Sequence, residues 1–371
     1  MTASSAIPRA GRLDCLCEPG ALGDGVADRG GIALLAIGFA LSVLSQVLSM
    51  SILPLAGLAF APSRGLAMLP YAAFYAGAAL ASLPASLLLD SFGRRAAFSL
   101  GASLGAAGGL VLVWALVKMH FGALALGAFW LGIASGFSLF YRHAAMPLGG
   151  RGRSAALLVF GAATLAALVA PTVATAAEAL ASPQAFVGMA IAASLAHVGS
   201  LTATSALPYR RIRATESKAE GLQDWRRILL PTVIGALAWF TMTGLMGATP
   251  VAMAGCGLSG AVAGTVAWHV MAMYAPSLAL ACLPGVARPI PMVAAGGALL
   301  TAGTLAFALS RQAEGFSLAA ALLGIGWSLA TLGTTLWVHR DGQPSRWLLG
   351  LHDGALLGAA LLGALAAGAF A

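Results

Sequence analysis

The chain has 371 residues, of which 60% are hydrophobic and only 9% are charged, whereas a soluble domain carries about 25% charged residues. The formal net charge is +8, but the basic residues gather at the ends of long apolar runs, which is a signal of membrane topology. This composition excludes a soluble domain and gives no sign of a nucleic-acid partner. It predicts an all-α polytopic membrane protein in a lipid bilayer, because the runs reach the roughly 20 apolar residues that a spanning helix needs.

The first segment, residues 1–30, is acidic in places and lacks a long apolar core. It therefore does not have the form of a signal peptide, and we expect a cytoplasmic N-terminal tail. Cys15 and Cys17 lie in this tail with one residue between them. Their spacing would allow both sulfurs to bind one Cu(I) ion, although two ordinary reduced thiols are the simpler interpretation.

Apolar runs follow one another along the rest of the chain and predict eleven spanning helices. The predicted spans are 31–58, 66–90, 96–118, 121–141, 154–176, 185–207, 229–248, 257–282, 290–310, 315–337 and 347–370. With the N-terminus inside, only Arg64, Lys118 and Arg311 of the 20 Lys and Arg residues fall outside. This asymmetry predicts a cytoplasmic N-terminus in a bacterial inner membrane.

The longest polar break, residues 208–228, follows the sixth span and divides the chain. We expect a bundle of six helices over 31–207, a cytoplasmic central loop, and a second bundle over 229–371. Two bundles around a central cavity are the layout of a transporter whose cargo binds near the bilayer midplane between the halves. Two bundles of six helices would require twelve spans, so the eleven predicted spans are one fewer than this layout.

The loop between spans two and three reads Ser-Leu-Leu-Leu-Asp-Ser-Phe-Gly-Arg-Arg over residues 86–95. It resembles the major facilitator superfamily signature Gly-x-x-x-Asp-Arg-x-Gly-Arg-Arg/Lys, with matches at Asp90, Gly93, Arg94 and Arg95. Ser86 and Ser91 stand where the signature has Gly and Arg. The resemblance implies a major facilitator fold and a gating role for the four matching residues, whose charges can hold one gate state. A plain topology anchor is the alternative interpretation of the two arginines.

Two consecutive spans carry pairs of soft metal ligands four residues apart, Met242 with Met246 and His269 with Met273. Residues at this spacing share one face of a helix, and thioether with imidazole favours copper, above all Cu(I). An imidazole within a membrane span is costly to bury, so it is also a candidate functional residue. The alternatives are that the methionines fill the core and that His269 bonds to a backbone carbonyl.

The paired motifs resemble those of the CcoA-type copper importers, which serve assembly of cbb3-type cytochrome oxidase. The resemblance implies import of copper into the cytoplasm. If Cys15 and Cys17 bind Cu(I), they would pass it to a cytoplasmic copper carrier. Met253 and Cys256 flank the outer loop and are expected to receive copper at the entrance, since a thiolate binds Cu(I) strongly. Copper would be the cargo, no permanent cofactor is expected, and the protein would not be an enzyme.

Two other functions are compatible with the sequence. The first is a proton-coupled major-facilitator exporter of small organic molecules, in which the methionines and His269 are packing residues. The second is a copper sensor or assembly factor that does not transport. His352 and Asp353 would couple protons or pair with Arg346, and the roles of His197 and Glu178 are left open by the sequence.

Overall fold

The computed structural model describes residues 24–146, 152–208, 225–283, 285–342 and 344–368. Most of the predicted tail, with Cys15 and Cys17, and most of the predicted central loop therefore lie outside the described residues. The described chain is helical throughout and contains no strand. Its helices are α1 (Asp24–Phe60), α2 (Leu69–Val117), α3 (Phe121–Ala145), α4 (Gly152–Gly161), α5 (Ala163–Ala181), α6 (Val187–Ser205), α7 (Trp225–Gly255), α8 (Val262–Cys282), α9 (Pro289–Leu309), α10 (Ala313–Val338) and α11 (Arg346–Ala367), with short 3-10 turns at Arg64–Leu66 and Ser259–Ala261.

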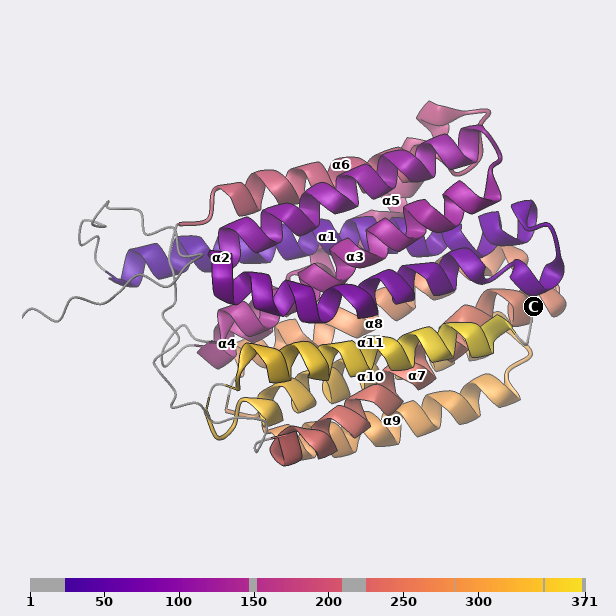
Figure 1. The fold of residues 1–371 in the computed structure, drawn as a ribbon. Helices are drawn as coiled ribbons and strands as arrows, with labels where there is room; N and C mark the ends of the chain where they lie inside the picture. Colours follow the sequence, from indigo (N-terminus) through magenta and orange to yellow (C-terminus); the bar gives the residue numbers. More distant parts are fainter. Residues whose placement is uncertain (1–23, 147–151, 209–224, 284, 343, 369–371) are drawn as a thin grey trace, which may run out of the picture.

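Ten helical segments of the described chain are long and apolar enough to cross a membrane. One of them contains α2, in which the chain reverses direction at Gly93 (Figure 1). The described residues therefore make eleven passages, as the sequence predicts. Gly93 has φ +80°, a left-handed conformation that a side chain disfavours. The glycine of the signature loop is therefore required by the backbone of this reversal.

The largest difference from the predicted spans lies in the seventh helix. The sequence predicts an end at residue 248, just before Pro250, whereas α7 continues to Gly255 with Pro231 and Pro250 inside it. Proline is a poor stop signal in a membrane, because neighbouring helices and side chains satisfy the backbone groups that it frees.

Small residues allow the helices to pack closely. A Cβ atom on Gly77 of α2 would lie 2.0 Å from the carbonyl oxygen of Phe129, and one on Gly132 of α3 would lie 1.8 Å from that of Phe74. Neither carbonyl is at the end of a flexible side chain, so the two backbones would have to separate. The many glycines of the chain thus bring helix axes together where lipid provides no hydrophobic driving force between them.

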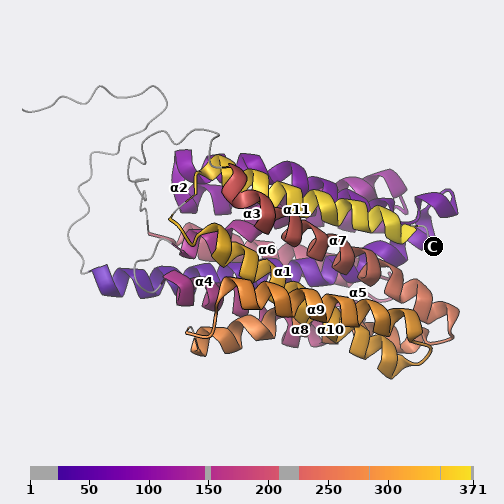
Figure 2. The same ribbon diagram turned by 90° about the horizontal axis from the view of Figure 1, so that it is seen from below.

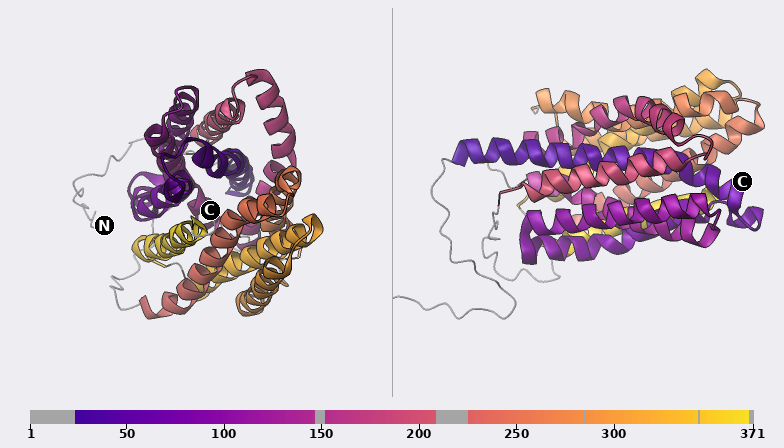
Figure 3. Two further views of the ribbon diagram at one scale, coloured as in Figure 1. Left: turned by 90° about the vertical axis from the view of Figure 1, so that its right-hand side faces the viewer. Right: turned by 90° about the horizontal axis from the view of Figure 1, so that it is seen from above.

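The helices run side by side along the long axis of the molecule (Figures 1 and 2). In the end-on view of Figure 3, the indigo-to-magenta helices and the orange-to-yellow helices form two groups. The two groups are joined where α11 packs along α2 and where α4 and α5 pack against α8. We call the end at which α2 reverses the basic end, because Arg94, Arg95, Arg340 and Arg346 lie there.

Candidate functional site

A cavity lies between the two groups of helices, with about 800 Å³ of empty space including the part open to solvent. Residues of α1, α2, α3, α7, α8 and α10 contribute to its lining. They are Gln46, Val47, Met50, Pro54, Tyr71, Tyr75, Leu139, Trp239, Met242, Met246, Pro250, Val266, His269, Val270, Met273, Tyr274 and Trp327.

Five aromatic side chains form much of this lining. Tyr71 and Tyr75 lie one helical turn apart on α2 and meet edge to face, with ring centroids 5.3 Å apart. Trp239 of α7 meets Trp327 of α10 at 4.9 Å and 72°, and Tyr274 of α8 lies 6.1 Å from Trp327. Aromatic rings held in this way present flat apolar surfaces to a bound molecule.

Several side chains with polar groups line the cavity. They are Gln46, Tyr71, Tyr75, Trp239, His269, Tyr274 and Trp327. His269 is 4% exposed, and its Nδ1 lies 2.7 Å from the carbonyl oxygen of Ala320. A carbonyl only accepts, so Nδ1 carries the proton and Nε2 keeps its lone pair. The indole Nε1–H groups of Trp239 and Trp327 are buried without an acceptor.

Four of the five predicted metal-binding side chains, Met242, Met246, His269 and Met273, line this cavity. The structure thus brings the two pairs together. Whether they bind a metal stays a prediction. Within the described ranges, no group of three or more His, Cys, Asp and Glu residues is placed to hold a metal ion.

The predicted entrance residues lie away from the cavity. Cys256 follows the end of α7 and is exposed, and Met253 is completely buried. Neither is among the lining residues. The extension of α7 to Gly255 explains the difference, because it turns the expected outer loop into helix.

The gating residues of the signature loop lie at the basic end. Arg94 is buried and its Nη1 lies 3.4 Å from the carbonyl oxygen of Ala144, while Arg95 and Asp90 are exposed. The carboxylate of Asp90 also acts electrostatically on Arg346 of α11, because α11 packs along α2 at this end.

A buried ion pair links the halves near the same end. Arg142 of α3 and Asp353 of α11 are 1% and 0% exposed, with Nη2 and Oδ1 2.6 Å apart. The sequence suggests Arg346 as a partner for Asp353, whereas Arg142 fills this role. The distance of 211 residues along the chain explains why no local pattern indicates the pair.

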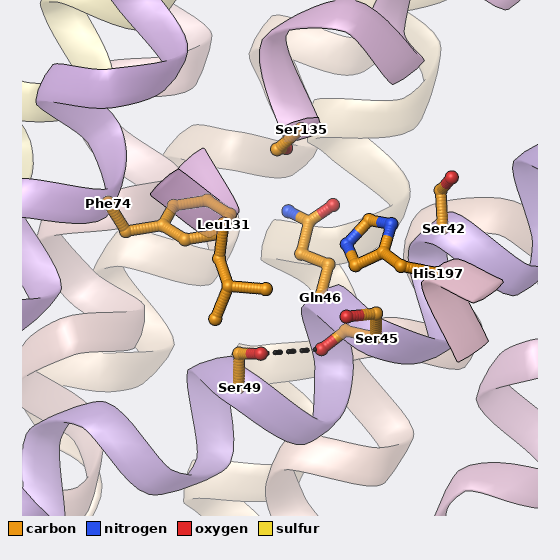
Figure 4. Close-up of a pocket in the computed structure, with 8 residues that line it drawn as sticks. All are labelled: Ser42, Ser45, Gln46, Ser49, Phe74, Leu131, Ser135 and His197. Atoms are coloured by element: carbon orange, nitrogen blue, oxygen red, sulfur yellow. Dashed lines mark hydrogen bonds between the residues drawn. The ribbon is translucent and has the colours of Figure 1, made fainter. Parts of the chain in front are cut away.

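Glu178 and His197, whose roles the sequence leaves open, have different surroundings. The Glu178 carboxylate accepts hydrogen bonds from the backbone N–H groups of Phe186, at 2.7 Å, and Met189, at 2.9 Å. It therefore caps the N-terminus of α6, where a negative charge is favourable. His197 lies in a small polar pocket among the amino-terminal helices (Figure 4), and its Nδ1 has no partner.

Sequence reasoning missed the aromatic lining and Gln46. One signal was available, since Tyr71 and Tyr75 stand four residues apart and so share a helix face. Trp239 and Trp327 lie on helices that are distant in sequence, and only tertiary packing brings them together.

Comparison with known proteins identifies the architecture. No family model matches the chain. It is similar over 92% of its length to the structure of the human organic anion transporter MFSD10, with a TM-score of 0.66, 16% identity and 92% of that chain covered. The Escherichia coli fucose:proton symporter FucP gives a TM-score of 0.59 at 16% identity, over 91% of this chain and 95% of the other. The chain has the major facilitator fold.

The expectation of a major facilitator fold from the signature loop is thereby confirmed. In sequence, the chain is 28% identical over 334 residues to the riboflavin transporter RfnT of Brucella anthropi, covering 87% of this chain and 83% of that protein. These relatives are transporters rather than enzymes. None of the three is a copper importer.

Proposed function

We propose that this membrane protein is a transporter of a small organic molecule with a flat aromatic ring system, and that riboflavin is the first candidate. The observation that carries the proposal is the cavity between the two groups of helices, which has five aromatic side chains in its lining. The similarity to a riboflavin transporter supports the same choice of cargo. The protein would act without changing its cargo chemically.

The polar groups of the cavity are complementary to a flavin. Its ring system is apolar at one end and carries two carbonyl oxygens and an imide N–H at the other. The indole N–H groups of Trp239 and Trp327 would donate to carbonyl oxygens, and Nε2 of His269 would accept from the imide N–H. These donors are buried and have no acceptor within the protein, so a cargo whose carbonyl oxygens reached them would remove the cost of burying them unpaired.

Copper is the second candidate, and one specific observation favours it. Met242, Met246 and Met273 line the same cavity as His269, whose Nε2 is free to bind a metal. Cu(I) would pass between these soft ligands by exchange, and a few weak sites would allow it to leave. This second proposal includes import of copper into the cytoplasm, its delivery to a copper carrier and its use in the assembly of cytochrome oxidase.

We further propose a bacterial inner membrane and a cytoplasmic basic end, which the distribution of Lys and Arg supports. The Arg142–Asp353 pair then closes the cytoplasmic side in this conformation. Transport would require the halves to rock so that this pair separates and the cavity opens toward the basic end.

The deciding experiment uses the full-length protein in proteoliposomes, with empty liposomes as the blank. Riboflavin uptake is followed by fluorescence, and copper uptake is followed by mass spectrometry in parallel. We expect saturable riboflavin uptake that requires the protein. Copper accumulation without any riboflavin uptake would overturn the organic cargo and favour the second candidate.

A further inference from the structure

Gln46 of α1 lies where the cargo cavity meets a second, smaller pocket. It lines the cavity between the two groups of helices and also the polar pocket within the amino-terminal half (Figure 4). Among the residues that the structure describes, only Gln46 lines both. The polar side chains around the smaller pocket are Ser42, Ser45, Ser49, Ser135 and His197. Gln46 therefore connects the cavity to a polar region that the aromatic lining does not include.

The polar groups around Gln46 are short of hydrogen-bond partners. Gln46 is half-buried, and its amide makes no hydrogen bond to any other described residue. The hydroxyl of Ser45 and Nδ1 of His197 are buried without a partner, in side chains that are 0% and 3% exposed. By contrast, the hydroxyl of Ser49 donates to the carbonyl oxygen of Ser45 at 2.8 Å, as is common for a serine in a helix. Unpaired polar groups are costly to bury, so this part of the cavity wall is suited to a polar partner.

That partner is expected to be uncharged. The cavity lining, as far as the structure describes it, contains no Lys, Arg, Asp or Glu. Arg142 acts electrostatically on Tyr274 of the lining, but Asp353 lies 2.6 Å from the Arg142 guanidinium and neutralises it. A charged group in the cavity would be desolvated without a counter-charge, which costs far more than burial of a neutral group that is hydrogen-bonded.

A hydroxyl group is the natural uncharged partner of the Gln46 amide. The amide donates from its NH₂ group and accepts at its carbonyl oxygen, and a hydroxyl can do both. Riboflavin carries a chain of hydroxylated carbons on its ring system. The groups assigned above to the ring belong to Trp239, His269 and Trp327 on α7, α8 and α10, whereas Gln46 is on α1 in the other half. A cargo that spans the cavity can therefore place its ring against one half and its chain against the other.

We propose that Gln46 is a specificity residue that hydrogen-bonds the uncharged, hydroxylated chain of the cargo. The inference rests on the proposed function, in which riboflavin is the cargo. A hydroxyl bonded to one end of the amide fixes the Gln46 side chain beside the smaller pocket. The other end of the amide can then pair with the Ser45 hydroxyl or with Nδ1 of His197. The aromatic side chains would bind the ring, and Gln46 would distinguish a flavin with its chain from a flavin without it.

The test compares riboflavin with lumiflavin, which has the same ring system and a methyl group in place of the chain. The Kd of each is measured by fluorescence quenching on titration with the purified full-length protein. Gln46→Met keeps an unbranched side chain of similar length and removes both polar groups of the amide. We expect this variant to weaken riboflavin binding by about fivefold, the value of one hydrogen bond, and to leave lumiflavin binding unchanged. The ratio of the two Kd values therefore changes by about fivefold.

Ser51→Ala is the matched control. Ser51 is also on α1 but lines neither pocket, and its hydroxyl donates to the carbonyl oxygen of Val47 on its own helix at 2.9 Å. This variant should keep the wild-type ratio of the two Kd values. An unchanged ratio in Gln46→Met would overturn the proposal. An equal loss of affinity for both flavins would also overturn it, because Gln46 would then support the fold of the cavity rather than recognise the chain.

A second measurement needs no variant and tests the requirement for an uncharged chain. Riboflavin 5′-phosphate differs from riboflavin by a phosphate at the end of the chain. The wild-type protein should bind it at least about tenfold more weakly, which corresponds to about 1.4 kcal/mol. Equal affinity for the phosphate ester would overturn the uncharged site.

Failure of the cargo and failure of the specificity residue give different results. If the wild-type protein binds neither riboflavin nor lumiflavin, the flavin cargo is rejected and the role of Gln46 is rejected with it. If the wild-type protein binds both and the ratio of their Kd values is the same in Gln46→Met, the flavin cargo stands and only the role of Gln46 is rejected.

Discussion

Truncation of Trp239 gives the clearest test of an aromatic cargo. Its side chain is 3% exposed, lines the cavity and buries an indole N–H without an acceptor. Trp239→Phe keeps a ring but removes the donor, so we expect a loss of about 1 kcal/mol, or about fivefold in the Kd for riboflavin. Trp239→Ala also removes ring stacking, and we expect it to weaken riboflavin binding by about 2–3 kcal/mol, or about 30- to 140-fold in Kd.

The measurement is the quenching of riboflavin fluorescence on titration with the purified full-length protein. The matched control is Trp268→Ala, because Trp268 lies on α8 beside His269 but is 61% exposed and does not line the cavity. This control should bind riboflavin like the wild type. Wild-type affinity in Trp239→Ala would refute the reasoning, since a cargo in this cavity cannot avoid the side chain.

Four further predictions address other parts of the molecule. The double variant His269→Ala, Met242→Ala should lose any copper accumulation and its competition by Ag(I), measured by mass spectrometry, while normal copper uptake would leave these residues without a metal role. Asp90→Asn should slow transport in proteoliposomes and leave cargo affinity unchanged; an equal loss of affinity would instead make Asp90 a binding or folding residue. Glu178→Gln should lower the free energy of unfolding by about 1 kcal/mol, because it weakens a charged cap of α6. An unfolding free energy equal to that of the wild type would contradict the capping role. Gly132→Ala should lower the free energy of unfolding by at least about 1–3 kcal/mol and reduce the amount of folded protein, because its Cβ would lie 1.8 Å from a carbonyl oxygen of α2. A normal folding yield would show that the helices can separate there.

The sequence by itself determined the membrane class, the eleven passages and the signature loop. Each of these depends on a local property: an apolar run long enough to cross the bilayer, or a glycine at the point where α2 must reverse with φ +80°. The four-residue spacing also placed Met242 with Met246 and His269 with Met273 on common helix faces. All four line one cavity, as their shared faces suggest, but a shared face does not identify a cargo.

Only the tertiary structure decided what surrounds these residues. Trp239 and Trp327 meet at 4.9 Å across two helices, and both line the cavity that also contains the four soft ligands. Arg142 and Asp353 are 211 residues apart in the chain, and nothing near either residue indicates the other. In a membrane every helix satisfies its own backbone hydrogen bonds. The sequence of each span is therefore enough to predict that a helix forms there. Which faces meet depends on close packing between helices, which is a property of the assembled bundle rather than of any one span.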